Sequence, residues 1–448
     1  MRMQHAEEAD VAKAASRAST APGRLTPAQL HVVITLGFCG LVSAADNWFV
    51  SPALPAIAST LAVAPTVAAI ILTAYLVPYG ALQPVCGRIG DGVGRLRLLR
   101  IIVLGLAVGT FLCAAAPSLS LLVVARIVTG CFAAGIISVS QAFVGDVVGR
   151  EHRAGAVGIL MGITFAGQGL SAGLGGILTD AVGWRAAFTA FGVLALIAWF
   201  GLFTLREPAH TKAGVVGRAD AEGAQGPESG AIGDGGAEGG ARASCRASAN
   251  PVVRFAADAL RIFFGPHRAV FLLACSTGVL FLGTYGLMGT FLAEACGLTP
   301  TESGLVMMLY GVFCLLGGAL SGRLGARRGL SHVISIGEVA GQVAALALVL
   351  SWATGSWAPA LVAAASLGLG YILVQPTLVT LSMEADPAQA GLCTGLIGFA
   401  VFACGGVGSA LGTALLAAGG YGLLWAAVLC CLIVQGLVSR RVLPVGAD

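Results

Sequence analysis

The sequence predicts an all-α polytopic membrane protein whose twelve transmembrane helices form two pseudo-symmetric six-helix bundles. Of its 448 residues, 57% are hydrophobic and only 10% are charged, and the mean hydropathy is +0.90. This composition excludes a soluble globular protein, and the apolar total matches about twelve spans of roughly 20 residues each. A membrane β-barrel is excluded because its strands alternate apolar and polar residues, whereas residues 101–116 are apolar on every face.

Each transmembrane helix is expected where the chain stays apolar for the length of one span. The expected helices are 30–52, 64–86, 98–115, 119–143, 154–178, 185–204, 268–292, 303–321, 333–352, 358–381, 389–416 and 421–439. Because their number is even, both termini are expected on one side of the membrane.

Basic residues indicate which side that is. Of the 25 Lys and Arg, 23 lie in the termini, the central linker and the loops on the same side as the termini; the exceptions are Arg126, inside a span, and Arg185. By the positive-inside rule, both termini are cytoplasmic. The short loops indicate a multi-pass protein of the bacterial cytoplasmic (inner) membrane.

A polar interval near the middle divides the spans six and six. Residues 207–250 contain ten Gly and no aromatic residue, a composition that favours a flexible linker. The Gly/Arg-rich segment 87–95 after span 2 recurs as 322–329 after span 8, which indicates a repeat of about half the chain. The expected domains are an N-terminal tail (1–29), a first bundle (30–205), a linker (206–262), a second bundle (263–440) and a C-terminal tail (441–448).

Other function classes find little support. The six His lie at termini, in loops or at span edges, without an HExxH motif, and Gly-x-Ser-x-Gly and phosphate-binding loops are absent from the sequence. The basic clusters lack interleaved aromatic residues, so no nucleic-acid partner is expected. No cofactor and no metal are expected. The expected partners are a small-molecule substrate, protons and the lipid bilayer, and the protein is expected to work as a monomer.

Three segments connect the chain to a known family. The loop after span 2 follows the pattern G-x-x-x-D-R/K-x-G-R-R/K, but has Gly92 and Leu96 where basic residues are usual. Residues 122–130 match L-x-x-x-R-x-x-x-G, and Asp46 with residues 53–55 matches D-x-x-x-x-x-x-A-L-P. With its six-plus-six spans, the sequence resembles the major facilitator superfamily, and within it the twelve-span drug:proton antiporters (multidrug or metabolite efflux), over nearly the whole chain.

Span 5 departs from that resemblance. Antiporters of this family usually carry a G-P-x-x-G-G element, and residues 171–176 here read Ser-Ala-Gly-Leu-Gly-Gly. The Gly-Gly pair is present and the Gly-Pro pair is missing, so the direction of transport stays open at this stage.

Asp46 and Arg126 are the expected proton-coupling residues. Charged groups inside spans are costly, which makes them the first candidates for a functional site. Asp46 in span 1 and Arg126 in span 4 lie at similar depth, and the resemblance places both spans beside a central cavity, so the two side chains are expected to pair. The repeat offset carries them to Leu282 and Val362, so the second bundle has no counterpart. Glu338 in span 9 is expected to have a packing or snorkelling role.

The loop after span 2 is the expected gate. Its candidate residues are Gly87, Asp91, Gly94 and Arg95. Glycines permit a tight turn, Asp91 can accept hydrogen bonds at a helix N-terminus, and Arg95 can pair with a nearby acid. The resemblance implies that this element locks the cytoplasmic side.

Polar and amphipathic residues in cavity-facing spans are the expected substrate contacts. They are Asn47, Tyr79, Gln83, Gln141, Gln168, Tyr285, Tyr371 and Gln375. With so few fixed charges, such a cavity favours a neutral or cationic amphiphile over a phosphate or dicarboxylate.

The resemblance therefore implies a proton-coupled secondary transporter that exports a small amphiphilic drug or metabolite by alternating access. A proton-coupled importer of a nutrient or metabolite is the main alternative. An intramembrane enzyme, or a non-transporting receptor on the same fold, is a remote one.

Overall fold

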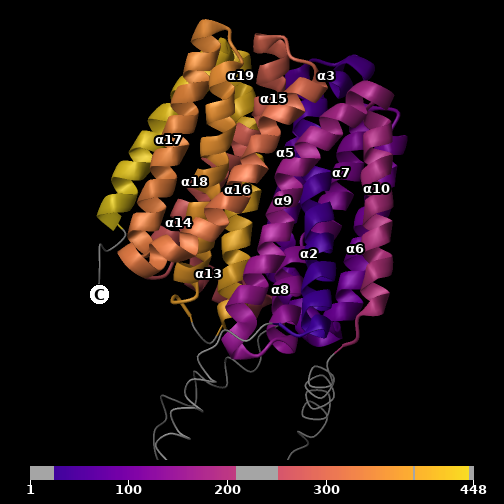
Figure 1. Cartoon of the computed structure of the whole chain (residues 1–448), viewed down its shortest axis with the longest axis vertical. Coiled ribbons are helices and arrows are strands. Elements are labelled where there is room, and N and C mark those ends of the chain that lie inside the picture. Colours follow the sequence, from indigo (N-terminus) through magenta and orange to yellow (C-terminus); the bar gives the residue numbers. More distant parts are fainter. Residues whose placement is uncertain (1–24, 208–250, 387–388, 443–448) are drawn as a thin grey trace, which may run out of the picture.

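The computed structural model describes residues 25–207, 251–386 and 389–442, which form helices joined by short turns, with no strand among them. Residues 1–24, 208–250 and 443–448, most of the expected tails and linker, lie outside the described part. Within the described part, eleven helices are long and apolar enough to cross a membrane. Figure 1 shows them packed side by side as two groups, the indigo-to-magenta half beside the orange-to-yellow half.

The last of these eleven helices supplies two spans. It runs over 52 residues, Gly391–Val442, and a helix of that length would be about 78 Å long, more than twice the apolar thickness of a bilayer. Its backbone leaves the helical region at Gly419 and Gly420, where φ of Gly420 is +71°. The chain reverses there, so the described helices contain the twelve expected spans.

The first bundle is built from the helices of residues 27–204. They are α2 (Pro27–Trp48), α3 (Val50–Thr60), α4 (Pro65–Ala68), α5 (Ile70–Val93), α6 (Arg95–Ala115), α7 (Leu119–Ala133), α8 (Ile136–Val147), α9 (Arg150–Val182), α10 (Trp184–Gly201) and the 3-10 turn η1 (Leu202–Thr204). A capping box starts α2, since Thr26 accepts from the Gln29 backbone N–H while the Gln29 side chain accepts from that of Thr26.

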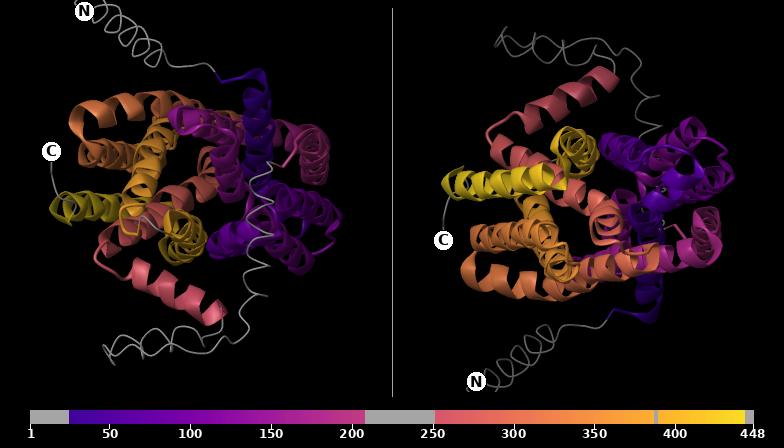
Figure 2. Two further views of the ribbon diagram at one scale, coloured as in Figure 1. Left: turned by 90° about the horizontal axis from the view of Figure 1, so that it is seen from below. Right: turned by 90° about the horizontal axis from the view of Figure 1, so that it is seen from above.

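The second bundle is built from the helices of residues 251–442. Its helices are α13 (Pro251–Phe263), α14 (Arg268–Thr277), the π-helix η2 (Gly278–Leu282), α15 (Gly283–Cys296), α16 (Pro300–Arg328), α17 (Leu330–Thr354), α18 (Ala358–Ser382) and α19 (Ala390–Val442). Seen along the spans in Figure 2, the two bundles lie against each other across a single interface.

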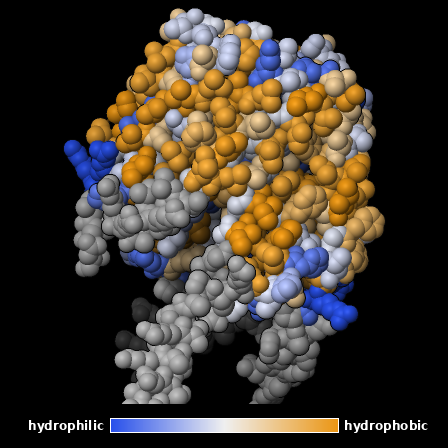
Figure 3. Space-filling view, viewed as in Figure 1, coloured by the Kyte–Doolittle hydropathy of each residue, from blue (hydrophilic) through white to orange (hydrophobic). Residues whose placement is uncertain are grey.

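We call the end of the molecule with Pro27, Thr204 and Arg268 the linker end, and the end with Thr60, Ala116 and Gly297 the far end. Figure 3 shows apolar side chains covering the middle of one face, with hydrophilic residues toward the two ends. The exposed apolar side chains at mid-span include Ile101, Val124 and Leu346. This arrangement suits a protein whose belt contacts lipid chains.

Turns with positive φ confirm the internal repeat. Gly94, between α5 and α6, has φ +98°, and Gly329, between α16 and α17, has φ +79°. These two glycines are 235 residues apart, the same spacing as the two Gly/Arg-rich segments. Only glycine adopts such angles readily, so both bundles reverse direction at an equivalent place by the same means.

The Gly/Arg-rich segments themselves are helical, not loops as the sequence analysis expected. Helix α5 continues through Gly87 to Val93, and α16 continues to Arg328, so only Gly94 and Gly329 form the turns. The i to i−4 ladder persists to its last step, in which the Gly94 N–H donates to the carbonyl of Gly90. A chain this rich in glycine can therefore stay helical until a positive φ ends it.

The first span is also longer than expected. It was predicted to end near residue 52, but α3 extends it to Thr60. Pro52 lies in the first turn of α3, where its missing N–H removes no helical hydrogen bond. Ala53, Leu54 and Ile57 are fully buried, so packing holds the added turns in place.

The end of the predicted linker is ordered as α13. Apolar residues recur every three to four positions and make this helix strongly amphipathic. Ile262 is buried, whereas the apolar side chains of Val253 and Leu260 are exposed. Arg261 holds the helix to the loop after α18 by an ion pair with Asp386 at 3.1 Å. The expected flexible segment therefore includes a helix tied to the second bundle.

Small residues bring the two bundles into backbone contact. Gly169 of α9 lies against Gly311 of α16, and a Cβ placed on Gly169 would lie 2.3 Å from the Gly311 Cα. Closer to the far end, a Cβ on Gly176 would lie 2.2 Å from the Pro300 carbonyl oxygen. Toward the linker end of the same helix, Gly162 has no neighbouring atom within 4 Å of such a Cβ. The contact between α9 and α16 is thus closest in the far half.

We expect Gly169→Ala to destabilise this conformation by about 1–3 kcal/mol, because the added methyl group has no room against Gly311. Gly162→Ala is the matched control, since it adds the same group to the same helix in open space and gains up to about 1 kcal/mol of helix propensity. Thermal unfolding of the two purified variants measures the difference. Equal melting temperatures would contradict the close α9–α16 contact.

Candidate functional site

Asp46 and Arg126 form an ion pair inside the first bundle. Asp46 lies near the end of α2 and Arg126 in the middle of α7, and an Arg126 guanidinium N–H donates to Asp46 Oδ2 at 2.9 Å. Their side chains are 1% and 0% exposed. The contact expected from the sequence is therefore present, in a place from which bulk water is excluded.

Each remaining oxygen of Asp46 also has a partner. The Thr110 hydroxyl of α6 lies 2.8 Å from Oδ1 and also 2.8 Å from the Leu106 carbonyl, so its one proton can go to either acceptor, and the Arg126 guanidinium donates to the Asp46 carbonyl at 3.1 Å. A fully hydrogen-bonded carboxylate beside a guanidinium is the arrangement that makes a buried charge tolerable. Arg126 therefore supplies the opposite charge that an ionised Asp46 needs at this depth.

Arg126 has further support that does not depend on the Asp46 carboxylate. It donates to Asn47 Oδ1 at 3.1 Å, and its guanidinium carbon lies 4.3 Å above the centre of the Tyr75 ring. Phe188 contributes a second ring at 5.9 Å. If Asp46 took up a proton, the arginine would keep an amide, a carbonyl and an aromatic face.

The expected gate residues lie at the linker end of the first bundle. Gly87 and Asp91 are in the last two turns of α5, and the Asp91 side chain lies outside the described part. Arg95, the first residue of α6, donates to the Ala142 carbonyl at 2.7 Å and pairs with Asp146 of α8. The sequence analysis missed Asp146 because it lies beyond the predicted end of span 4.

The expected substrate residues divide into two groups. Asn47 faces Arg126 inside the first bundle, and the Gln141 amide donates to the Met161 sulfur at 3.0 Å. The others lie near the interface of the two bundles. They are Tyr79 and Gln83 of α5, Gln168 of α9, Tyr285 of α15, and Tyr371 and Gln375 of α18, all buried.

Aromatic rings join the two bundles at this interface. Trp48 of α2 contacts Tyr285 of α15 with 5.0 Å between ring centres, and Tyr285 stacks on Tyr310 of α16 at 4.1 Å. Tyr310 is 6.1 Å from Tyr371, which lies 6.0 Å from Phe165 of α9. We call these five residues the aromatic cluster; the sequence analysis missed Trp48, Tyr310 and Phe165 as parts of it.

Several polar atoms at this interface lack a partner. Among the described residues, the Tyr371 hydroxyl, Gln168 Oε1 and Gln83 Nε2 are buried without a hydrogen bond, and the Tyr310 hydroxyl has only the Cys314 sulfur as a weak partner. An unpaired buried polar atom lowers the stability of the protein by about 1–3 kcal/mol. A bound molecule that forms hydrogen bonds with these atoms would remove that cost. The rings offer flat apolar contact and the unpaired atoms offer both donors and acceptors.

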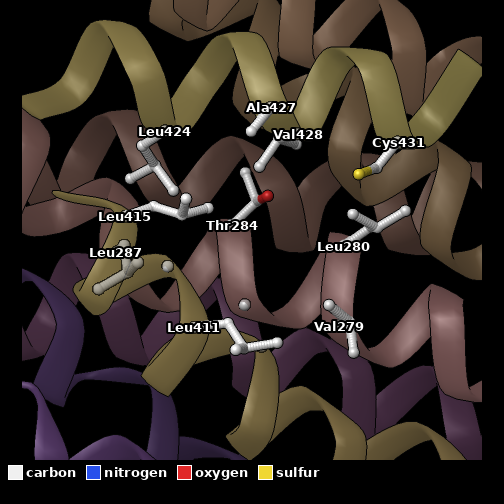
Figure 4. A pocket seen from close by; sticks show the side chains of 13 residues that line it. Val279, Leu280, Thr284, Leu287, Leu411, Leu415, Leu424, Ala427, Val428 and Cys431 are labelled. Atoms are coloured by element: carbon white, nitrogen blue, oxygen red, sulfur yellow. The ribbon is translucent and has the colours of Figure 1, made fainter. Parts of the chain in front are cut away.

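A separate apolar pocket opens on the second bundle. It has a cavity volume of about 140 Å³ and lies between α15 with η2 and the two halves of α19 (Figure 4). Leucines and valines line it, and Thr284, whose hydroxyl has no partner, is its main polar group. It contains no residue of the aromatic cluster, and nothing in the sequence analysis pointed to it.

Comparisons with known proteins agree with this architecture. A family model described as Major Facilitator Superfamily matches residues 36–409. The chain is 29% identical over 157 residues to the puromycin resistance protein pur8 of Streptomyces alboniger, which is 35% of this chain and 31% of that protein.

Two further relatives are fungal. The multidrug resistance protein fnx1 of Schizosaccharomyces pombe is 33% identical over 165 residues, 36% of this chain and 31% of that protein. The efflux pump dotC of Dothistroma septosporum is 28% identical over 173 residues, 36% of this chain and 29% of that protein. The chain thus spans about a third of the length of the curated relatives that it matches.

Two repeated six-helix bundles that meet along glycine-rich helices, together with a family match over residues 36–409 of 448, establish that this chain belongs to the Major Facilitator Superfamily of membrane transporters.

Proposed function

We propose that this protein is a proton-coupled transporter that exports a small amphiphilic compound by alternating access. The observation that carries this proposal is the buried Asp46–Arg126 pair, because it is an ionisable contact inside the membrane with a second set of partners ready for the arginine. Intramembrane charges are retained where they serve a function.

Protonation would change the strength of this contact. In the described conformation, the Asp46 carboxyl group lies within hydrogen-bonding distance of both Arg126 and Thr110. A proton on the carboxyl group removes the charge attraction, while Asn47 and Tyr75 keep the guanidinium in place. Because α2 and α7 are joined through this pair, its loosening would allow the two helices to move relative to each other.

The closed far end supports alternating access. The Ser51 hydroxyl donates to the Gly286 carbonyl at 2.7 Å, and the Thr301 N–H donates to Asp180 at 2.7 Å, so both contacts tie one bundle to the other. If the linker end is cytoplasmic, as the basic residues predict, this conformation is closed to the outside. Few polar bonds need to break for the bundles to separate there.

The gate residues would act in the opposite conformation. Arg95 is paired with Asp146 within the first bundle here, so this ion pair braces α6 against α8. We propose that Gly87, Asp91, Gly94 and Arg95 close the linker end when the far end opens, with Asp146 as a further member of that gate.

The substrate would bind at the aromatic cluster. Stacked tyrosines and unpaired hydroxyl and amide groups suit a flat, partly apolar molecule that is neutral or cationic. Among the described residues, no arginine or lysine belongs to the cluster, which disfavours phosphates and dicarboxylates. The resistance and efflux names of the relatives support this substrate class.

The resistance and efflux names of the relatives also favour export as the direction of transport. Residues 171–176, which lack the usual Gly-Pro pair, still pack closely: a Cβ on Gly173 would lie 3.0 Å from the Met308 sulfur, and one on Gly175 would lie 2.3 Å from the Phe49 Cβ. The missing Gly-Pro pair keeps a proton-coupled importer as the second candidate. We further propose a monomer in a bacterial inner membrane with both termini in the cytoplasm.

We expect Asp46→Asn to abolish the response of transport to a pH gradient, because asparagine cannot exchange a proton. The variant should also be less stable by about 3 kcal/mol, since Arg126 loses its counter-charge. Everted vesicles with an imposed pH gradient measure uptake of a fluorescent cation. Glu302→Gln, at an exposed helix start, is the control and should transport normally. Undiminished proton-driven flux in Asp46→Asn would eliminate the coupling role.

We expect Tyr310→Phe and Tyr371→Phe to weaken substrate binding several-fold with little loss of stability. Among the described residues, the Tyr371 hydroxyl has no hydrogen-bond partner and the Tyr310 hydroxyl has only the weakly bonding Cys314 sulfur. Tyr421→Phe removes a hydroxyl bonded to Glu294 at the surface and serves as the control. Substrate-induced shifts of the melting temperature report binding. If all three variants bind alike, the substrate does not use the aromatic cluster.

A further inference from the structure

One side of α13 carries an exposed apolar stripe. Val253, Ala257, Leu260 and Phe264 follow one another at spacings of three and four residues, and all four side chains are exposed. The three larger ones are each more than half exposed. Phe264 continues the helix, since its N–H still donates to the Leu260 carbonyl. This spacing places the four side chains on one face of the helix, and we call them the α13 stripe.

Another side of α13 is packed on the second bundle. Ile262 is buried, and the ring centre of Phe263 lies 5.2 Å from that of Phe271 in α14 and 6.3 Å from that of Phe399 in α19. The ion pair between Arg261 and Asp386 adds a polar contact. The described residues therefore hold α13 in place by one side and leave the α13 stripe uncovered.

The connection to α14 places α13 at the level of the membrane surface. Helix α13 ends at Phe263, and the span that includes α14 begins at Arg268, so only residues 264–267 separate them. In this turn the Arg268 N–H donates to the Gly265 carbonyl. In Figure 2, which looks along the spans, α13 is the pink helix that lies lengthwise at the outer edge of the second bundle. A helix that lies across the span direction, so close to the start of a span, is at headgroup depth.

The bilayer accounts for the exposure of the α13 stripe. A run of apolar side chains that faced water would be unfavourable and would promote association. At headgroup depth the same run can enter the boundary between headgroups and acyl chains. The lipid-facing belt begins on the next helix, where Leu272 of α14 is half exposed. The α13 stripe therefore continues, at the membrane surface, an apolar surface that the spans already present to lipid.

Arginines border the α13 stripe. Arg254 and Arg261 each directly follow a member of the stripe, and their seven-residue spacing puts them along one edge of it. Among the described residues, Arg254 has no acidic partner within 4 Å. Arg261 has two, Asp258 at 3.9 Å and Asp386 at 3.1 Å, and its side chain remains more than half exposed. Both guanidinium groups are thus accessible beside an apolar surface.

We propose that α13 is a membrane-surface helix that binds anionic phospholipids. The α13 stripe enters the bilayer surface, and Arg254 and Arg261 contact the lipid phosphates along its edge. Arginine suits this role because its planar group can bind two phosphate oxygens at once and keeps its charge. The binding needs neither a substrate nor a proton gradient, so it is independent of the proposed transport.

Asp386 links this lipid site to the rest of the second bundle. It lies between α18 and α19, and its Oδ2 accepts from Arg261 at 3.1 Å and from the Gln389 amide at 3.3 Å. A lipid phosphate and the Asp386 carboxylate therefore bind the same guanidinium. Removing the charge of Asp386 would leave Arg261 more available to lipid and make the site more positive.

Photo-crosslinking of the full-length protein tests the proposal. Leu260 is replaced by the photoreactive residue p-benzoylphenylalanine, and the protein is placed in nanodiscs of phosphatidylcholine and anionic phosphatidylglycerol in equal amounts. The same replacement at Leu346, half exposed at mid-span, is the control that samples the lipids of the belt. Mass spectrometry after illumination identifies the adducts. We expect lipid adducts at both positions, with phosphatidylglycerol enriched about fivefold at 260 relative to 346, the effect of about one basic residue at a membrane surface.

Charge variants test the role of the arginines. We expect Arg254→Gln to lower the enrichment, and Arg254→Gln combined with Arg261→Gln to abolish it. Asp386→Asn should raise it, whereas Glu294→Gln, at an exposed acid of the far end, should leave it unchanged. Arg254→Gln keeps the ion pair with Asp386, so this variant should fold even if the double variant does not.

Four results would overturn the proposal. If position 260 forms no lipid adduct, the α13 stripe faces water. If it cross-links to a second copy of the chain instead, another protomer covers the stripe. Equal lipid ratios at positions 260 and 346, or an enrichment that survives the loss of both arginines, would show that α13 does not recognise anionic headgroups.

Discussion

The structure depends on keeping a full positive charge inside an apolar belt. Arg126 of α7 is completely buried, and it is tolerated because three other helices bring partners to the site: α2 brings the Asp46 carboxylate and Asn47, α5 brings the Tyr75 ring, and α6 brings the Thr110 hydroxyl beside Asp46. Removing any one of these helices would leave the charge without compensation. The ion pair therefore fixes the relative placement of the inner helices of the first bundle, as well as offering a site for a proton.

The interface between the two bundles depends mainly on close packing of small residues. Gly169 meets Gly311 and Gly80 meets Ala403, and each contact is made by atoms that carry no charge. Contacts of this kind are stabilised by close packing and can be exchanged for equivalent ones after a small displacement, whereas hydrogen-bonded charges would hold one position. An ion pair within the first bundle, and an interface in which close glycine packing is supplemented by a few hydrogen bonds such as that from Thr301 to Asp180, suit a rigid-body transition.

The sequence predicted the transmembrane spans and the charged residues inside them. It did not predict which side chains of different helices would contact each other. Apolar length located the twelve spans, and the rarity of intramembrane charge singled out Asp46 and Arg126, which do touch. Tyr310 and Phe165 were missed because an aromatic residue in a span carries no sign of which helix it will face. The contact of Asn47 with Arg126 was also not foreseen, since the sequence does not show which partner a buried amide will find. The helical course of residues 87–93 was hidden by their glycines.

The two bundles have the same arrangement of helices, but their buried charged residues lie at different positions. Packing explains this difference. The repeat carries Asp46 to Leu282, which is fully buried within η2, and Arg126 to Val362, which is half exposed on the outer surface of the second bundle. An arginine at 362 would face lipid without a partner, so the pair could not be kept on both sides of the repeat. The acid of the second bundle is instead Glu338, on a different helix and with amide and hydroxyl neighbours in place of a guanidinium. Arg126 compensates the charge of Asp46 at contact distance, whereas the printed hydrogen bond of Glu338 comes from the neutral hydroxyl of Ser439. The two bundles therefore accommodate a buried acid by different means.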